Sequence, residues 1–499
     1  MAIDCPCVFD LESPIRGNRL TDATRNLDDR RVAAKLIFSD DRLFPSDPAT
    51  REIARGLYNQ VAGLPIISPH GHVDPRLLLD DEPFPDPAEL LIVKDHYVTR
   101  LLHASGIPLE SLNVGKSTGA DPRAIWRHFA ENWHLFAGTA SGYWLTHVFA
   151  TLFDFEVEPS AETADSLYDQ IVARIEQPDF RPRALFDRFG IEFLATTDDP
   201  LDDLAPHRAL AADPSFTGRV TPTFRPDAYL DPTAPGFAER AERLTAVVGR
   251  PADDFAGYLE ALESRRAYFV ENGAVSADHG VVEPYTVDLS DDDAAALYAR
   301  AVAGTLDPAG AREFRGNMLL RMAGMSASDG LVMTIHPGVS RNHSSSAFSR
   351  FGPDTGHDIP IQTEYTANLR PMLERYGLTP DLHIVLFAVD ETVYSREVAP
   401  LAGFYPSLFI GAPWWFLDAP DAVLRFRQAV TETAGFYRSA GFIDDTRAYL
   451  SIPARHDMAR RLDSAFLARL VREGRVSEER AASIAVDLVD ALPRKVFKL

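Results

Sequence analysis

The segment Leu64-Pro65-Ile66-Ile67-Ser68-Pro69-His70-Gly71-His72 decides the fold and carries the first chemical signal. Its apolar start predicts a buried strand, and residues two apart in a strand point to the same side. The imidazoles of His70 and His72 are therefore expected to aim at one point as the strand ends. A carboxylate from another strand end would complete a metal site of two neutral nitrogens and one oxygen, with room left for substrate. Asp445, which follows the apolar run 441–443, is the candidate for that carboxylate.

Short apolar runs of this kind recur along the chain, and each ends in polar or ionisable residues. Continuous apolar runs are typical of parallel strands that are buried on both faces. Eight such runs are what a (β/α)8 barrel needs, and barrel active sites lie at the carboxyl ends of the strands. The runs are 65–68, 191–195, 219–224, 274–277, 331–335, 382–389, 407–410 and 441–443.

One gap between these runs is anomalous. About 120 residues separate His72 from Ile191, far more than one crossover helix requires. Apolar residues at three- and four-residue spacing fill this gap, which predicts a helical subdomain inserted after the first strand. We therefore expect a distorted (β/α)8 barrel in three parts. These are a helical segment with the first strand at 1–80, the helical insertion at 81–188 and the remaining barrel at 189–499.

Composition limits the classes of partner. The chain has 499 residues, of which 45% are hydrophobic, and a formal net charge of −23. An acidic chain lacks the basic field that nucleic acid or an anionic membrane attracts. Only Cys5 and Cys7 are cysteines, so no disulfide framework is expected, and no secretory signal or membrane span is visible. We expect a cytoplasmic protein with a small-molecule substrate, and its oligomeric state, a homo-oligomer included, stays open.

Other polar residues at strand ends are candidates for substrate binding. Arg225 offers paired donors for an anion, and a structural ion pair with Asp227 is the competing interpretation. His336 and Arg341 belong to a glycine-containing loop after a strand, where histidines are often functional. Trp414 is either a stacking wall for a sugar or a packed core residue.

The metal count also follows from the strand ends. The fourth run ends at Asp278 with no lysine to bridge two metals, and the sixth ends at Asp390 with its histidine at the other end. The sequence therefore favours one metal ion over two. Zinc is the first candidate, and manganese, iron or cobalt would suit two imidazoles and a carboxylate as well.

The joint order and spacing of several short stretches resembles the uronate isomerases (glucuronate isomerases), divergent members of the amidohydrolase superfamily. The resemblance runs almost from end to end. The stretches are Asp40-Asp41-Arg42-Leu43-Phe44, His70-Gly71-His72, Asp95-His96-Tyr97, Thr196-Thr197-Asp198-Asp199-Pro200, Arg225-Pro226-Asp227, Val275-Ser276-Ala277-Asp278-His279, His336-Pro337-Gly338, Gly352-Pro353-Asp354, Trp414-Trp415-Phe416, Asp445-Thr446-Arg447 and Arg455-His456.

The resemblance implies a distorted barrel, one divalent metal and an aldose–ketose isomerisation. The expected reactions convert D-glucuronate to D-fructuronate and D-galacturonate to D-tagaturonate. Carried over to this sequence, His70, His72 and Asp445 would hold the metal, and Tyr97 and Arg447 would contact the substrate near its carbonyl.

Further roles implied by the resemblance are these. Arg225 would line the pocket, and Asp278, His279, His336 and Arg341 match further polar positions. In a proton-transfer mechanism Asp445 and Tyr97 are the candidate base and relay, and Arg447 is the candidate partner of the enediolate oxygen.

Two alternatives remain at the level of the sequence. A metal-dependent amidohydrolase or lactonase would use the same barrel with an activated water. A barrel that binds a sugar acid without turnover is the second, because a fold alone never proves an activity. Departures from the better-known bacterial pattern at Asp390-Glu391, 411–413 and 344–349 leave the sugar preference open.

Overall fold

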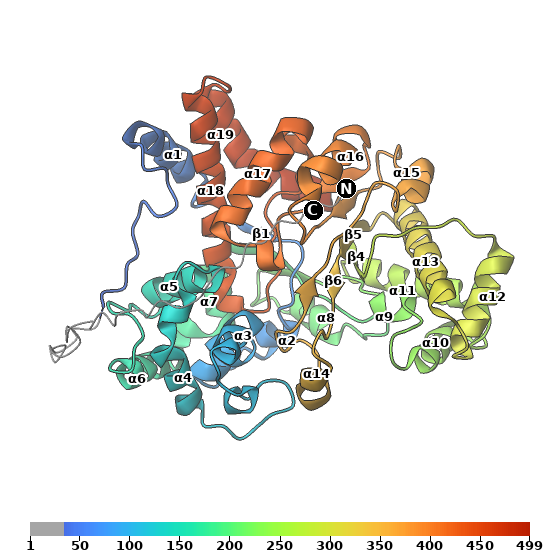
Figure 1. Ribbon diagram of the computed structural model, residues 1–499, viewed down its shortest axis with the longest axis horizontal. Coiled ribbons are helices and arrows are strands. Elements are labelled where there is room, and N and C mark those ends of the chain that lie inside the picture. Colours follow the sequence, from blue (N-terminus) through green and yellow to red (C-terminus); the bar gives the residue numbers. More distant parts are fainter. Residues whose placement is uncertain (1–33) are drawn as a thin grey trace, which may run out of the picture.

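The computed structural model describes residues 34–499 (Figure 1). Cys5 and Cys7, and with them the expectation about the start of the chain, lie outside the described residues. Within residues 34–499, no helix combines the length and the apolar character needed to cross a membrane.

Parallel strands form the centre of the molecule. One sheet has the order β1-β2-β3 and a second has the order β4-β5-β8-β9, with every neighbouring pair parallel. Phe224 joins the two sheets, because it makes parallel bridges to both Asp198 and Ala277. The strands are β1 (Ile66–Ser68), β2 (Ile191–Ala195), β3 (Arg219–Thr221), β4 (Ser276–Val281), β5 (Val332–Pro337), β8 (Ile384–Leu386) and β9 (Leu408–Ile410).

The eighth run, 441–443, was expected to be the last strand of the distorted barrel, but it is not a regular strand. Gly441 at φ 81° and Asp445 at φ 39° have left-handed backbone conformations, which interrupt an extended segment. The segment still completes the ring. The N–H of Ala440 donates to the carbonyl of Ile410 at 2.9 Å, and the N–H of His72 donates to the carbonyl of Thr446 at 3.0 Å. The barrel is therefore distorted at its last position.

Helices surround the strands, and local sequence signals set their ends. In α13 (Pro308–Asp329), for example, the Asp307 side chain accepts from the N–H of Gly310 at the start, Pro308 occupies the first turn, and Gly330 at φ 83° ends the helix. The other helices around the barrel are α8 (Ala205–Ala212), α9 (Asp227–Leu230), α10 (Phe237–Thr245), α11 (Phe255–Glu271), α12 (Asp291–Val302), α15 (Arg370–Tyr376), α16 (Ala399–Phe404) and α17 (Pro420–Ala434).

The two ends of the described chain pack together. Helix α1 (Pro48–Val61) lies along α18 (Ile452–Arg472) and α19 (Glu478–Val486), and together they bury a cluster that includes Leu57 and Phe466. The chain ends with α20 (Leu492–Phe497), whose side chains reach the base of the barrel.

Helices also fill the gap between β1 and β2, and Figure 1 shows them gathered on one side of the molecule, away from α10, α12 and α13. Their core is aromatic, with Trp126, Phe129, Trp133 and Phe149 in mutual ring contact. The division of the chain at residues 80 and 188 stays a prediction. These helices are α2 (Pro75–Asp80), α3 (His96–Ala104), α4 (Pro122–Glu131), α5 (Ala140–Leu152), α6 (Ala164–Ile175) and α7 (Pro182–Arg188).

The connection after β5 is the last element that shapes the site. It contains a short antiparallel ribbon of β6 (Val339–Ser340) and β7 (Ile359–Pro360), with α14 (Ser345–Phe351) between them. Phe351 is buried in the aromatic core of the inserted helices, and its carbonyl accepts from the N–H of Lys116 at 3.1 Å. This connection therefore spans from the barrel to the inserted helices.

Candidate active site

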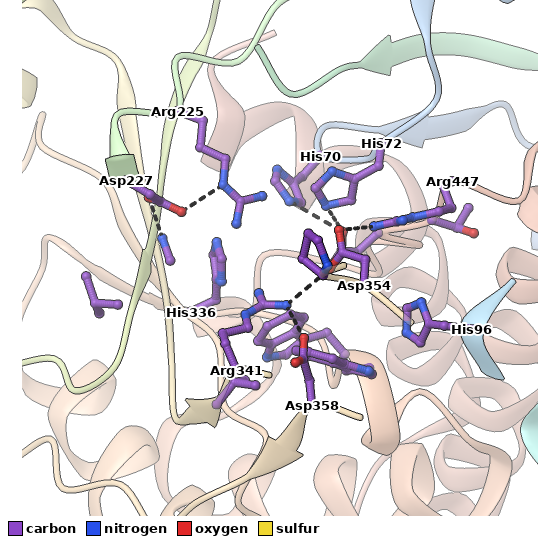
Figure 2. A pocket seen from close by; sticks show the side chains of 18 of the residues that line it. His70, His72, His96, Arg225, Asp227, His336, Arg341, Asp354, Asp358 and Arg447 are labelled. Atoms are coloured by element: carbon purple, nitrogen blue, oxygen red, sulfur yellow. Dashed lines mark hydrogen bonds and ion pairs between the residues drawn. The ribbon is translucent and has the colours of Figure 1, made fainter. Parts of the chain in front are cut away.

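A cavity of about 530 Å³ opens at the carboxyl ends of the strands. Many segments that are far apart in the sequence contribute to its lining, which is typical of barrel active sites. Figure 2 shows His70, His72, Arg225, His336, Arg341 and Arg447 directed toward this space from different sides.

Three potential metal ligands converge on one wall of the cavity. The Oδ1 atom of Asp445 lies 3.1 Å from Nε2 of His72 and 3.4 Å from Nε2 of His70. One ligand atom from each residue lies within 4.8 Å of the other two. Asp445 Oδ1 is buried, and neither nearby nitrogen makes a hydrogen bond to it. Two imidazoles and a carboxylate in this arrangement fit a divalent metal ion.

The charges in this cluster keep the Asp445 carboxylate ionised and favour a proton on His70. Burial raises the pKa of Asp445, but the neighbouring His70 and His72 outweigh it and hold that pKa well below its usual range. Burial lowers the pKa of His70, while Asp278 and Asp445 raise it to about 9. Burial also lowers the pKa of His72. Since a metal binds only neutral imidazole, metal and proton compete for His70.

Four residues that line the cavity have a strained backbone. Asn342, Asp354, Trp415 and Asp445 all line it and have φ values of 55°, 58°, 55° and 39°, in the left-handed region that residues with a Cβ rarely adopt. Such strain persists only where the surroundings enforce it, and it clusters at functional sites. The turn at Asp445 is what directs its carboxylate toward the two histidines.

Arg225 makes the ion pair that the sequence offered as one interpretation, and it also lines the cavity. Its Nε donates to Oδ2 of Asp227 at 2.8 Å, and Oδ1 of Asp227 accepts from the N–H of Gly280 at 2.8 Å. Burial lowers the pKa of Arg225, while Asp227 and Asp278 raise it, so the guanidinium is charged. The pair therefore fixes the orientation of a cation that still faces the cavity.

Asp278 lies behind the metal-ligand cluster. Its carboxylate accepts from Oγ1 of Thr334 at 2.5 Å, lies 2.8 Å from Nε2 of His336 and is 3.9 Å from Nε2 of His70. Burial raises its pKa, but His336 and His70 lower it well below its usual range. Asp278 thus orients His336 at the cavity and holds a negative charge beside His70.

The lining beside the metal-ligand cluster carries arginines and acids in pairs. Nη2 of Arg447 lies 3.6 Å from Oδ2 of Asp354, and Nη1 of Arg341 donates to Oδ2 of Asp358 at 2.9 Å (Figure 2). The guanidinium of Arg341 also lies over the Trp415 ring at 4.8 Å. These pairs fix the guanidinium groups of Arg341 and Arg447 at the cavity, and both side chains stay partly exposed.

Tyr97 lines the cavity beside these pairs. Its ring stacks on His96 at 4.6 Å and meets the edge of Trp144 at 5.7 Å. Burial raises the pKa of Tyr97 well above its usual value, so the phenol is protonated at neutral pH. It can donate a proton or hydrogen bond into the cavity.

Trp414 and His279, both candidates for substrate binding, differ in their position relative to the cavity. Trp414 lines the cavity and meets the ring of His336 edge-on at 5.0 Å, while the rest of its ring is packed. His279 does not line the cavity. It follows Asp278 in β4 and so points to the other face, where its Nδ1 lies 3.0 Å from the carbonyl of Thr334.

Several lining residues were missed by sequence reasoning. Asp358, Lys94, Asp231 and Arg315 all line the cavity, and Arg315 extends from the middle of α13. A charged residue inside a long helix carries no signal that distinguishes it from the solvated face of that helix.

The fold and the site together define a class. A distorted parallel barrel with His-x-His after its first strand and an aspartate after its last position is a barrel of the amidohydrolase type, here with several arginines among the residues that line its cavity.

Comparison with known proteins identifies the family within this class. A family model described as glucuronate isomerase matches residues 47–495. A uronate isomerase from Corynebacterium efficiens is 55% identical over 460 residues, which are 92% of this chain and 98% of the relative. One from Sphingopyxis alaskensis is 53% identical over 467 residues, which are 93% of this chain and 99% of the relative.

Solved structures agree. The crystal structure of a glucuronate isomerase from Caulobacter crescentus superposes with a TM-score of 0.91 at 49% identity, covering 93% of this chain and 97% of that one. A uronate isomerase from Thermotoga maritima gives 0.87 at 26% identity, covering 92% and 99%. This chain belongs to the glucuronate isomerase family.

Membership confirms three predictions made from the sequence: the resemblance, the barrel-like α/β fold and the aldose–ketose isomerase activity on a uronate. The hydrolase or lactonase alternative is not favoured. The relatives that this chain matches over nearly their whole length are named uronate isomerases.

Proposed function

We propose that this cavity converts D-glucuronate to D-fructuronate and D-galacturonate to D-tagaturonate. The convergence of His70, His72 and Asp445 beside Arg225 and Arg447 is the observation that carries this proposal. Together they offer a metal site next to fixed cations for an anionic sugar.

One divalent metal, zinc foremost, is proposed at His70, His72 and Asp445, and manganese, iron or cobalt would satisfy the same ligands. Within residues 34–499 this is the cluster whose ligand atoms come close enough to hold an ion. When bound, the metal would supply a fixed positive charge that anchors the carboxylate end of the sugar.

The sugar itself is held by the remaining lining residues. Arg225 is a charged donor whose position is set by Asp227, and Arg341 offers further N–H donors to hydroxyls. His336 directs Nε2 to Asp278, and its Nδ1, which has no partner among the described residues, is left to hydrogen-bond a hydroxyl. Trp414 provides an apolar face against the ring or chain of the sugar. Asp278 acts through His336 and lies too deep to touch the sugar, and His279 has no place in the proposed contacts.

Isomerisation moves a proton from C2 to C1 and a second proton from O2 to O1. Asp445 is ionised and is the proposed base at C2, and the protonated Oη of Tyr97 is the proposed relay. Arg447 would stabilise the negative charge that develops on the enediolate oxygen, because a guanidinium stays charged at every working pH.

Isotope exchange tests the proton mechanism. D-Glucuronate carrying deuterium at C2 is turned over in ordinary water, and deuterium at C1 of the product is measured by NMR. Loss of deuterium in a measurable fraction of turnovers supports a base that exchanges with solvent. Complete retention at C1 would favour a hydride shift and would remove Asp445 and Tyr97 as base and relay.

A substitution separates the relay from metal binding. Tyr97 is not one of the three proposed metal ligands, so Tyr97→Phe should keep its metal and lose roughly 100- to 10,000-fold in turnover. We also propose a cytoplasmic location, which rests on the low cysteine content of the sequence.

A further inference from the structure

A buried cation behind the active site has no role in the reaction described so far. Arg455, in the first turns of α18, has 3% of its surface exposed, yet it reaches the edge of the cavity. Burying a guanidinium is costly unless it is paired and fully hydrogen-bonded. Its partners therefore indicate what the charge is for.

These partners belong to separate parts of the chain. One Nη1 hydrogen bond goes to Oδ2 of Asp418, just after the tryptophans of the cavity wall, and Nη1 also donates to the carbonyl of Asp444 at 3.4 Å. Nε donates to Oγ of Ser451 at 3.0 Å. Arg455 thus connects α18 to the wall segment and to the residue that precedes Asp445.

The flat face of the same guanidinium lies against the inserted helices. Its central carbon is 3.4 Å from the centre of the Trp144 ring on α5. Trp144 in turn meets the Tyr97 ring edge-on at 5.7 Å. One side chain therefore lies between the segment that carries Asp445 and the aromatic support of Tyr97.

Net stabilisation is a weak explanation for this arrangement. A buried ion pair often contributes no more than an apolar replacement of the same volume. Oδ1 of Asp418 lacks a hydrogen-bond partner among the described residues, so the pair is not even fully satisfied. The carboxylate of Asp444 is held instead by His456 at 3.0 Å, which leaves Arg455 bound to the backbone of the turn.

We propose that Arg455 is a positioning residue that fixes Asp445 and Tyr97 relative to each other, by holding the 444–447 turn and the Trp144 ring at the same time. This inference rests on the proposed roles of Asp445 and Tyr97. Because those groups must reach adjacent atoms of one sugar, a displacement of about 1 Å costs on the order of 100-fold in rate.

The test compares Arg455→Lys and Arg455→Ala with the wild-type holoenzyme, measuring kcat and KM for D-glucuronate, bound metal and melting temperature. With metal at a saturating concentration, so that its content matches wild type, both variants should lose about 100-fold in kcat with KM within about threefold. Added guanidinium ion should restore part of the kcat of Arg455→Ala, because it can replace the missing group at the cavity edge, and should not restore Tyr97→Phe.

Arg266 provides a matched control for the loss of a buried arginine. It is 1% exposed, it pairs with Asp329 at 2.6 Å and 3.0 Å, and it lies outside the cavity lining. Arg266→Ala should lower the melting temperature while the kcat of the folded protein stays close to wild type.

The outcomes separate the inference from the proposed function. Wild-type kcat in folded Arg455 variants, or an equal loss of kcat in Arg266→Ala, would overturn the inference while the isomerase proposal stands.

If neither Arg455 variant folds, Trp144→Phe is the deciding variant, since it weakens the same connection. A kcat loss of about 10-fold or more at unchanged KM and metal content supports the inference, and unchanged kcat overturns it. Failure of the wild-type holoenzyme to isomerise either uronate would instead refute the proposed function.

Discussion

Gly280 is the position at which one added methyl group tests the geometry of the substrate site. It lies in β4 opposite His336 of β5, and its backbone φ is not in the left-handed region, so alanine is acceptable to the backbone. A Cβ there would lie 2.6 Å from Oδ2 of Asp227, 2.7 Å from Cε1 of His336 and 3.0 Å from Nη2 of Arg225. The first two distances are shorter than any normal contact, so those side chains must move.

The size of the effect follows from these contacts. Overpacking a well-filled site by one methyl group typically costs about 1–3 kcal/mol. The Arg225–Asp227 pair and His336 are the groups displaced, so much of that cost should fall on substrate and transition-state binding. One to three kcal/mol corresponds to a loss of roughly 5- to 150-fold in kcat/KM.

The assay is kcat/KM of Gly280→Ala for D-glucuronate and D-galacturonate, with melting temperature and metal content measured on the same samples. Gly56→Ala is the matched control, because a Cβ at Gly56 has no neighbour within 4 Å and α1 lies far from the cavity. The control should keep wild-type activity and gain a little stability, since alanine favours helix. A Gly280→Ala enzyme with wild-type kcat/KM for both sugars would refute the placement of Arg225 and His336 around the substrate.

Four further predictions follow from the same structure. Arg447→Lys should keep its metal and its melting temperature but lose most turnover, because lysine lacks the paired donors of arginine; full activity would remove Arg447 from the mechanism. Chelation should abolish turnover and lower the melting temperature, because a ligand at 100 times its Kd contributes about 2.7 kcal/mol to stability; an unchanged melting temperature would argue against a tightly held metal. Gly115→Ala should strongly destabilise the protein, because its Cβ would lie 2.0 Å from the carbonyl oxygen of Phe351 at a φ of 62°; wild-type stability by thermal melting would show that the 338–360 connection is not fixed there. Burial lowers the pKa of His279 to about 4, so the folded state keeps it neutral while the unfolded state binds a proton below about pH 6.5. Its contribution is therefore present above pH 6.5 and lost as the pH falls toward 4, at up to about 1.4 kcal/mol per pH unit, and His279→Asn should flatten that dependence in denaturant titrations; an unchanged slope would contradict the burial argument.

The sequence predicted the parts of the fold that depend on local pattern. Continuous apolar runs predicted the positions of β1, β2, β5, β8 and β9, because strands buried on both faces need unbroken apolar side chains. The run 274–277 overlaps β4 (Ser276–Val281) only at its first two residues, since β4 continues through Asp278 and His279. The same pattern misjudged the last position, since nothing in an apolar run such as 441–443 shows that Gly441 and Asp445 adopt left-handed conformations.

The candidate site divides along a similar line. His70, His72 and Asp445 were found because two-residue spacing and strand ends are visible in one dimension, and the structure brings them together. Asp278 and His279 could not be told apart without the register of β4, which directs one inward and the other outward.

Contacts between distant segments could not be predicted from the sequence. Asp358 holds Arg341 only because the 338–360 connection folds back as the β6–β7 ribbon. Arg455 meets Trp144 only because the inserted helices pack against α18. Such pairings depend on tertiary packing, which a single sequence does not display.

The most direct test of the central claim is the conversion of D-glucuronate and D-galacturonate, each incubated with metal-replete protein and followed by NMR. We expect ketose signals of D-fructuronate or D-tagaturonate to appear, and Arg447→Lys with full metal content to produce them far more slowly. No conversion of either sugar by a folded, metal-loaded protein would contradict the account and would return the hydrolase on a lactone or amide as the reaction to test.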